Sequence, residues 1–441
     1  MRSGEPHRRL KALRGWRALI FLLPVLALAE TDPPQPAQLK DLRGVAQAEF
    51  NQDASRILIR LRTGEVGLWD VATGMAISAA FGSEKATCCV MSADRKRVVI
   101  GFAETSRVFD STAGSALSPA FAVPLNEHLP TPAVFSPDGE LLVVLRQKEA
   151  SIWRVKAGEK IKTIPLPAGP HEDAPPEAIF TEAGAHCFLM DPDGTVTRYD
   201  TQSWGRAGKP MRHRRREFAY EFGFTASEDG RWIATWDDAG ENGPKTGLQV
   251  WDARAGKALG SLLTGINGFV GYFLPGQNRI LIKAARGEGQ VRDLPSMKLR
   301  YKIRTFDDLS GAPVAFSPEG KWILSWDSRD TLDAIDAESG TIRATTAGSG
   351  SISQVLFGPD SSAAYVFRDN PDNAQEQYAE NEITKLTVPD LKPVGSVRAL
   401  EITQDFSLSR DGRYLLLRCG APDEEQVRVI ETRTMQPVAA Q

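Results

Sequence analysis

Residues 135–158 read FSPDGELLVVLRQKEASIWRVKAG, and the outline of this stretch returns along most of the chain. An apolar residue and a polar turn come first, a short apolar strand follows, and a second strand ends in an aromatic residue and a turn near glycine. Short apolar runs of this kind predict β-strands. In the first turn proline presets φ, Asp138 binds nearby backbone amides and Gly139 accepts a positive φ, so the stretch predicts a tight hairpin.

Nine stretches share this outline, and they open at Phe50, Met91, Phe135, Phe180, Ala226, Phe273, Phe316, Phe357 and Leu408. The interval is roughly 40 to 50 residues, the period of four-stranded propeller blades. A sheet this small buries its faces only by packing against its neighbours. Aromatic residues near the ends of the units, Trp69, Trp153 and Trp251 among them, are expected to fill the gaps between blades.

These motifs resemble the WD40-repeat family over residues 45–441. The resemblance implies an all-β fold, a single β-propeller of eight or nine blades with four antiparallel strands in each. The family's Gly-His dipeptide is missing, and only His128 and His213 lie where its histidine would lie. Hydrophobic packing, rather than the family's buried Ser/Thr-His-Asp-Trp hydrogen-bond network, is therefore expected to supply more of the stability.

The first 29 residues have the pattern of a secretory signal peptide. Six basic residues precede residue 18, and residues 18–29 are almost wholly apolar and end in Ala27-Leu28-Ala29. The alternative is a membrane anchor, but this run is shorter than the roughly 20 residues that span a bilayer. We predict cleavage near Ala29, export to the periplasm or the medium, and no transmembrane span in the mature chain. Residues 30–44 are interpreted as a linker in which residues 37–42 supply a ring-closing strand.

The charge and cysteine content of the chain limit the classes of partner that it can bind. Removal of residues 1–29 takes away six basic residues and one acid, so the formal net charge moves from −3 to −8. A mildly acidic chain lacks the basic footprint that nucleic acid requires. The cysteines Cys88, Cys89, Cys187 and Cys419 are too few for a disulfide framework and are interpreted as small buried residues; a disulfide would need distant units to meet. We expect a monomeric ring.

Three units are longer than the rest, and the extra residues fall between the second and third strands. The inserts are residues 237–247, 369–382 and 420–426. In a propeller these loops emerge on the same face as the blade-to-blade connections, and insertions confined to one face are typical of a binding face. The basic run at residues 212–216 joins that face. The candidate binding residues are Arg212, His213, Arg214, Arg215, Asp237, Asp238, Glu241, Asp369, Asp372, Glu376, Tyr378 and Asp423.

Motifs for catalysis, metals and cofactors are lacking in the sequence. The mature chain has four histidines in no metal-ligand spacing, and no nucleophile elbow or phosphate loop appears. The sequence therefore favours an exported scaffold that binds a protein partner through the loop-bearing face, with no cofactor and no metal. The alternative is an envelope enzyme of hydrolase, lyase or lactonase type. Its site would lie at the central channel, where the polar first-strand residues are Glu49, Glu177, Gln354 and Asp405.

Overall fold

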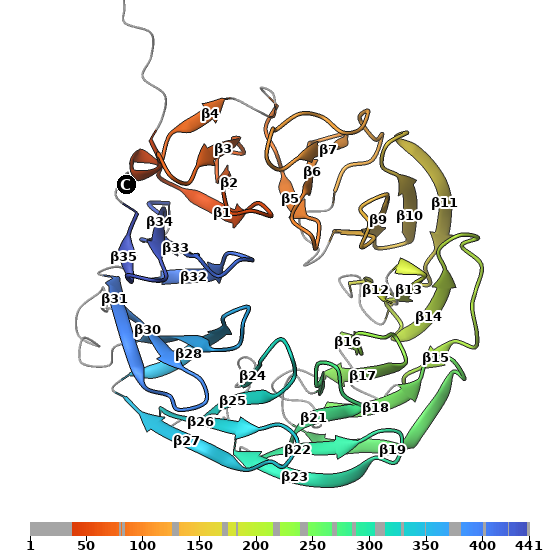
Figure 1. Cartoon of the computed structure of the whole chain (residues 1–441). Helices are drawn as coiled ribbons and strands as arrows, with labels where there is room; N and C mark the ends of the chain where they lie inside the picture. Colours follow the sequence, from red (N-terminus) through yellow and green to blue (C-terminus); the bar gives the residue numbers. More distant parts are fainter. Residues whose placement is uncertain are drawn as a thin grey trace, which may run out of the picture. The chain divides into compact units, whose positions relative to one another are not determined.

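The computed structural model describes residues 38–438, except 79–80, 82–83, 126–131, 170–174, 182–183, 215–220, 239–245, 267–270, 285–287, 305–313, 328–329, 349, 370–380, 400–402 and 422. Residues Ala37–Gln441 form one compact unit. Within it nine antiparallel sheets follow one another around a ring (Figure 1). The predicted all-β propeller is confirmed, and the number of blades is nine.

Each sheet runs from an inner first strand to an outer last strand. Blades 1 to 3 contain β1 (Val45–Phe50), β2 (Arg56–Leu61), β3 (Val66–Asp70) and β4 (Ala76–Ser78); β5 (Cys88–Met91), β6 (Arg97–Gly101) and β7 (Ser106–Asp110); and β8 (Ala133–Phe135), β9 (Leu141–Arg146), β10 (Glu149–Arg154) and β11 (Glu159–Pro165). Blades 4 to 6 contain β12 (Glu177–Thr181), β13 (His186–Met190), β14 (Thr195–Asp200) and β15 (Met211–Arg212); β16 (Glu221–Ala226), β17 (Trp232–Asp238), β18 (Thr246–Asp252) and β19 (Lys257–Ile266); and β20 (Gly271–Phe273), β21 (Arg279–Ala284), β22 (Glu288–Asp293) and β23 (Lys298–Arg304).

Blades 7 to 9 contain β24 (Val314–Phe316), β25 (Trp322–Trp326), β26 (Thr331–Asp336) and β27 (Ile342–Ala347); β28 (Ser351–Phe357), β29 (Ala363–Asp369), β30 (Asn381–Thr387) and β31 (Pro393–Ala399); and β32 (Thr403–Leu408), β33 (Tyr414–Cys419), β34 (Gln426–Glu431) and β35 (Gln436–Pro437). Blade 2 departs from four strands. The residues after β7 make only single bridges, Phe109 with Ala116 and Ser106 with Phe121.

The hairpin turn that opens the unit of blade 3 forms as predicted. In blade 3 Oδ1 of Asp138 accepts hydrogen bonds from the Glu140 amide (3.0 Å) and from the Ser136 hydroxyl (2.5 Å). Gly139 has a φ of 69°, and a Cβ at this position would lie 2.1 Å from Nη1 of Arg97 in blade 2. The positive φ therefore favours glycine here, whereas the contact with Arg97 involves the end of a flexible side chain that can move aside.

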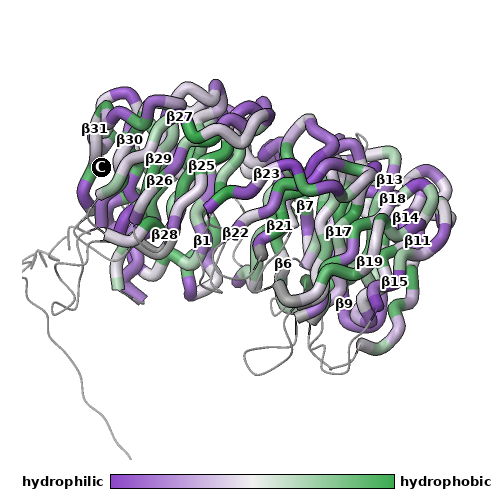
Figure 2. The backbone as a smooth tube through the Cα atoms, turned by 90° about the horizontal axis from the view of Figure 1, so that it is seen from below, coloured by the Kyte–Doolittle hydropathy of each residue, from purple (hydrophilic) through white to green (hydrophobic). Residues whose placement is uncertain are grey.

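The large aromatic residues fill the gaps between blades, which confirms their predicted role. Trp153 packs with Val99 and Val108 of blade 2, and Trp251 packs with Phe188 of blade 4. Figure 2 shows the ring edge-on, with hydrophobic residues in the strands and hydrophilic residues concentrated in the turns. In the described part of the chain, no helix is long and apolar enough to cross a membrane.

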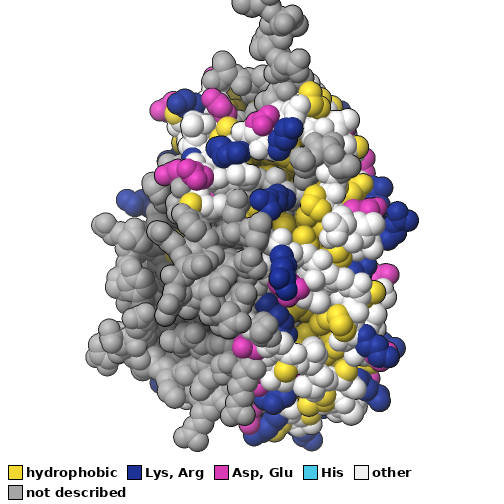
Figure 3. All heavy atoms as spheres, turned by 90° about the vertical axis from the view of Figure 1, so that its left-hand side faces the viewer, with side chains coloured by type: hydrophobic (Ala, Val, Ile, Leu, Met, Phe, Trp, Pro, Cys, Tyr) yellow, Lys and Arg dark blue, Asp and Glu magenta, His cyan; other side chains and the backbone are white. Residues whose placement is uncertain are grey.

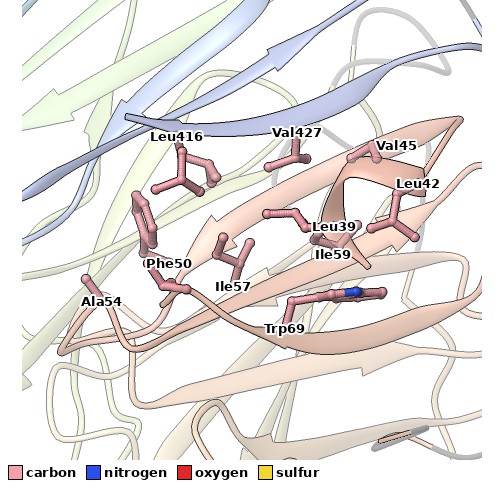
Figure 4. Close-up of a cluster of buried hydrophobic side chains, with 12 residues drawn as sticks. Leu39, Leu42, Val45, Phe50, Ala54, Ile57, Ile59, Trp69, Leu416 and Val427 are labelled. Carbon is pink, nitrogen blue, oxygen red and sulfur yellow. The ribbon is translucent and has the colours of Figure 1, made fainter. Parts of the chain in front are cut away.

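Among the described residues no strand is shared between the first and last blades, so the strand predicted at residues 37–42 is corrected for the part of it that is described, residues 38–42. Gln38 forms one bridge with Met75 of blade 1, and Leu39–Asp41 form a short 3-10 helix, η1. Blade 9 is completed by its own β35, which pairs with β34. Leu39 is fully buried between Ile57 and Ile59 of blade 1 and residues of blade 9 (Figure 4). The segment before blade 1 therefore plugs the joint between the first and last blades instead of extending a sheet.

An ion pair links blades 1 and 9 at the same joint. Glu425, in the insert of blade 9, is fully buried, and its carboxylate accepts hydrogen bonds from the guanidinium of Arg62 in blade 1, with Nε 3.1 Å from Oε1. The Glu425 carbonyl also accepts the Val45 amide at 3.1 Å. We name Arg62, Glu425 and Val45 the clasp. The blade 9 insert is thus part of the ring closure.

Candidate functional site

The strand order divides the propeller into two faces. We call the surface formed by second-to-third-strand loops and blade-to-blade connections the loop face, and the opposite surface the turn face. The predicted inserts do fall between second and third strands, after β17, after β29 and after β33. In blade 3, by contrast, the same loop is a tight two-residue turn between the paired residues Arg146 and Glu149. Variation in loop length is therefore confined to the loop face of particular blades.

The turn face is regular because its hairpins repeat one hydrogen-bond scheme. A serine hydroxyl donates to an aspartate carboxylate two residues later at Ser92, Ser136, Ser227 and Ser409. The pKa of Asp200, in another turn on this face, is lowered by hydrogen bonds from Ser203. These carboxylates stabilise turns, so they are not free for chemistry.

Blade 5 contains the buried network that the sequence led us not to expect. Nδ1 of His213 lies 2.8 Å from Oγ1 of Thr235, which accepts a hydrogen bond from Nε1 of Trp251 at 2.9 Å. Nε2 of His213 lies 3.5 Å from Oδ1 of Asp237, and that oxygen accepts the Gly247 amide at 2.8 Å. Hydrogen bonds therefore join the histidine, hydroxyl and tryptophan of a Ser/Thr-His-Asp-Trp arrangement in this blade, while Nε2 of His213 faces Asp237 without a hydrogen bond among the described residues.

The burial of this network changes the role of two candidate residues. The side chains of His213 and Asp237 are both fully buried. They stabilise the base of the blade 5 loop from inside, where a partner has no access to them. Sequence reasoning missed this role because His213 lies in a basic run and Asp237 at the start of an acidic insert, and both stretches have the composition of surface loops.

Strand pairing locates the equivalents of this network in other blades. Thr235 pairs with Gln249 and Asp237 with Gly247, whereas in blade 4 Leu189 pairs with Thr197 and the Asp191 amide bonds to Thr195. Asp191 thus occupies the aspartate position without a hydroxyl or histidine partner at the equivalent sites. Burial, and then the charge of Asp193, raises the pKa of Asp191 to about 7, against a smaller opposite effect of Arg206.

Blade 7 keeps the hydroxyl and the acid but replaces the imidazole with a guanidinium. Ser325 is the equivalent of Thr235, and Asp327 is the equivalent of Asp237. Nε of Arg304, at the end of blade 6, lies 3.4 Å from Asp327, and its Nη2 donates to buried Asp333 at 2.8 Å. Polar networks at this level of the ring are therefore structural, and they join neighbouring blades.

The remaining candidate residues divide into surface positions and positions outside the described residues. Arg212 and Arg214 are exposed on the loop face, with Arg212 3.5 Å from Asp193, and Asp423 is exposed 3.6 Å from Arg62. Asp238 ends β17 and Asp369 ends β29, at the bases of their inserts. Outside the described residues lie Arg215, Glu241, Asp372, Glu376 and Tyr378.

A cavity of about 590 Å³ lies on the loop face at blade 3. It is lined by Pro124, Leu125, Arg146, Gln147, Lys148 and Glu149. Sequence reasoning missed it because this loop has no insert. The sequence does contain a signal for it, because the two cations Arg146 and Lys148 lie within a four-residue turn between predicted strands.

The channel residues proposed for the enzyme alternative lie in four different blades. Glu49, Glu177, Gln354 and Asp405 belong to blades 1, 4, 8 and 9, so three of the four lie in blades that follow one another across the ring closure. Glu49 accepts a hydrogen bond from Gln47 at 2.6 Å, within its own strand. No group of three or more His, Cys, Asp or Glu side chains in the described residues is arranged to hold a metal ion.

Known proteins resemble this chain in fold and not in sequence. No protein-family model matches the sequence, and no curated protein matches it. The crystal structure of the eukaryotic initiation factor matches with a TM-score of 0.62 and 14% identity, over 87% of this chain and 94% of that one. The C-terminal WD40 domain of Sif2 matches with a TM-score of 0.50 and 11% identity, over 90% of this chain and 98% of that one.

BamB from Moraxella catarrhalis matches with a TM-score of 0.47 and 13% identity, over 75% of this chain and 96% of that one. At these identities the likeness is one of fold. The nine sheets make the chain a β-propeller, and these structures are similar to it in that fold.

Proposed function

We propose that this protein is an exported scaffold that binds a protein partner on its loop face. The observation that carries the proposal is the position of the inserts in blades 5 and 8, which lengthen second-to-third-strand loops while the turn face keeps short, hydrogen-bonded hairpins. Repeat proteins commonly bind partners through the face on which their repeats carry insertions. The rim for binding consists of the loops of blades 5 and 8 together with exposed Arg212 and Arg214.

The insert of blade 9 is excluded from this rim as a primary contact. Glu425 is buried against Arg62 and closes the ring. Asp423 remains exposed beside it. Among the described residues in the view of Figure 3, cationic and anionic side chains are interspersed.

Export is supported by the signal pattern of residues 1–29 and agrees with the state of the cysteines. All four are free thiols, and Cys89, Cys187 and Cys419 are buried. Burial raises the thiol pKa of Cys89 and of Cys187, which disfavours the reactive thiolate. Because buried thiols of raised pKa are slow to oxidise, they are compatible with an oxidising compartment. N-terminal sequencing of the exported protein is expected to begin at Glu30, and an intact Met1 on the mature protein would refute cleavage.

Affinity capture tests the binding face. The bait is the full chain expressed with its leader, and the comparison variant replaces residues 239–245 and 370–380 each with Asn-Gly. This dipeptide suits a two-residue hairpin, and the flanking residues Asp238 and Thr246, and Asp369 and Asn381, remain in their strands. A partner recovered with the wild type and lost with the variant is the expected result. Equal recovery by both would contradict the proposal.

The same variant makes a prediction about stability. Because the paired strands continue to the base of each insert, the shortened protein is expected to keep its melting temperature within about 3 °C of the wild type. Circular dichroism during heating measures this. A large decrease would show that the inserts stabilise the fold, and the capture result would then say nothing about a binding face.

A further inference from the structure

We infer that the cavity at blade 3 is a binding pocket for a short acidic peptide segment. This inference rests on the proposed function, because it assigns a chemistry to one part of the loop face. We name the cavity the blade 3 pocket. Its volume of about 590 Å³ lies within the range of roughly 300–1,000 Å³ that is usual for ligand pockets.

The pocket is built on a rigid turn. Arg146 pairs with Glu149 at the end of the β9–β10 hairpin, so only Gln147 and Lys148 form the turn between them. The Lys148 carbonyl accepts the Leu166 amide at 2.9 Å, which ties the turn to the residue after β11. A short turn held by the sheet keeps its side chains in place before a ligand arrives, and this lowers the entropic cost of binding.

The charged side chains of the turn have no partner of opposite charge among the described residues. Arg146 and Lys148 are exposed, and no ion pair or side-chain hydrogen bond joins either of them to the described part of the chain. Other exposed cations of the same blade, Lys156 and Lys162, also have no partner among the described residues, and Arg146 and Lys148 differ from them because they line a cavity. Two cations that line one cavity and have no partner among the described residues favour a ligand that supplies carboxylates.

The apolar residues of the pocket lining favour a peptide over a small anion. Leu125 is buried and Pro124 is half-buried, and both line the cavity. A free phosphate would use the cations and leave this apolar wall without a contact. A peptide with acidic side chains places carboxylates against Arg146 and Lys148 and its aliphatic portions against Pro124 and Leu125. Glu149 and the Gln147 amide are available for its backbone N–H and C=O groups.

Fluorescence anisotropy with a labelled peptide tests the pocket. The probe is a fluorescein-labelled hexapeptide of alternating glutamate and leucine, and its counterpart has glutamine in place of glutamate. Wild type is expected to bind the glutamate peptide, with an affinity that falls at high salt. Arg146→Glu with Lys148→Glu should weaken binding by about tenfold or more, as expected when two partly desolvated ion pairs are lost.

A matched control has the same change of charge in the same blade. Lys156→Glu with Lys162→Glu reverses two exposed lysines outside the pocket, and this variant should bind within about twofold of the wild type. Melting temperatures of both variants verify that they fold. The inference is overturned if the wild type does not bind, if both variants weaken equally, or if inorganic phosphate displaces the probe as well as unlabelled peptide does.

The two experiments distinguish an error in the pocket inference from an error in the proposed function. The variant with shortened inserts in blades 5 and 8 retains all six pocket residues, so it should still bind the glutamate peptide. Loss of partner capture with intact peptide binding would support both statements. If the protein binds the peptide but captures its partner equally with and without the inserts, the pocket inference is supported and the proposed binding rim is contradicted.

Discussion

Arg62→Ala is expected to lower the free energy of unfolding by more than the loss of an exposed surface pair does, because it leaves the buried carboxylate of Glu425 without its principal partner at the joint between blades 1 and 9. The Arg62 side chain is 47% exposed, so water screens part of its charge, and Arg418 remains near Glu425. Urea denaturation followed by circular dichroism measures the loss.

An exposed pair provides the control for this prediction. Nη1 of Arg154 lies 3.0 Å from Oε2 of Glu159 within blade 3, and both side chains are more than half exposed. Arg154→Ala should cost less than about 1 kcal/mol, the usual contribution of a surface pair. If Arg62→Ala and Arg154→Ala cost the same, the clasp contributes nothing special and the ring is closed by hydrophobic packing around Leu39 alone.

Acid should remove the advantage that the clasp provides. The hydrogen bond from Arg62 lowers the pKa of Glu425 despite the burial of this carboxyl. A lowered folded-state pKa contributes stability above the ordinary pKa of glutamate, and that contribution disappears as the pH falls through the folded value. The difference between wild type and Arg62→Ala is therefore expected to be full at neutral pH and to close in acid. A difference that persists unchanged below the folded pKa would contradict the assignment.

Trp251→Ala is expected to cost about 3–5 kcal/mol, the range for loss of a large aromatic core side chain. Its indole is 9% exposed and packs between blades 4 and 5, and its Nε1 donates to Thr235 in the buried network. Trp251→Phe keeps most of the packing and removes the donor, so it should cost about 1–3 kcal/mol. Chemical denaturation of both variants measures the two contributions, and a cost below about 1 kcal/mol for Trp251→Ala would show that the network is not part of the core.

The repeats predicted most of the fold because each unit has its own turn and strand chemistry. The Ser-Pro-Asp-Gly hairpin at residues 136–139 specifies its own hydrogen bonds, and Trp153 is identified as an inter-blade residue by its place in the unit. Ring closure was not predictable in the same way. Leu39 and Glu425 meet at the joint although almost the whole chain separates them, and neither belongs to a repeated motif.

The sequence predicted where the inserts fall in the blades, but it did not predict which of the candidate residues are buried. Loop length correctly placed the inserts between second and third strands. Composition alone did not separate exposed Arg212 from its buried neighbour His213, because burial there depends on Thr235 and Asp237 in a different strand. The blade 3 pocket was missed for the opposite reason, since a short turn gives no length signal even where its charges lack partners.

Site-specific photocrosslinking in the producing cells tests most directly whether a partner binds the loop face. A photoreactive residue is introduced singly at Arg212 or Arg214 on the loop face, and at Ala113 or Gln202 on the turn face; all four positions are exposed. The account predicts the same crosslinked partner from both loop-face positions and none from the turn-face positions. Crosslinks from Ala113 or Gln202, with none from Arg212 or Arg214, would contradict it.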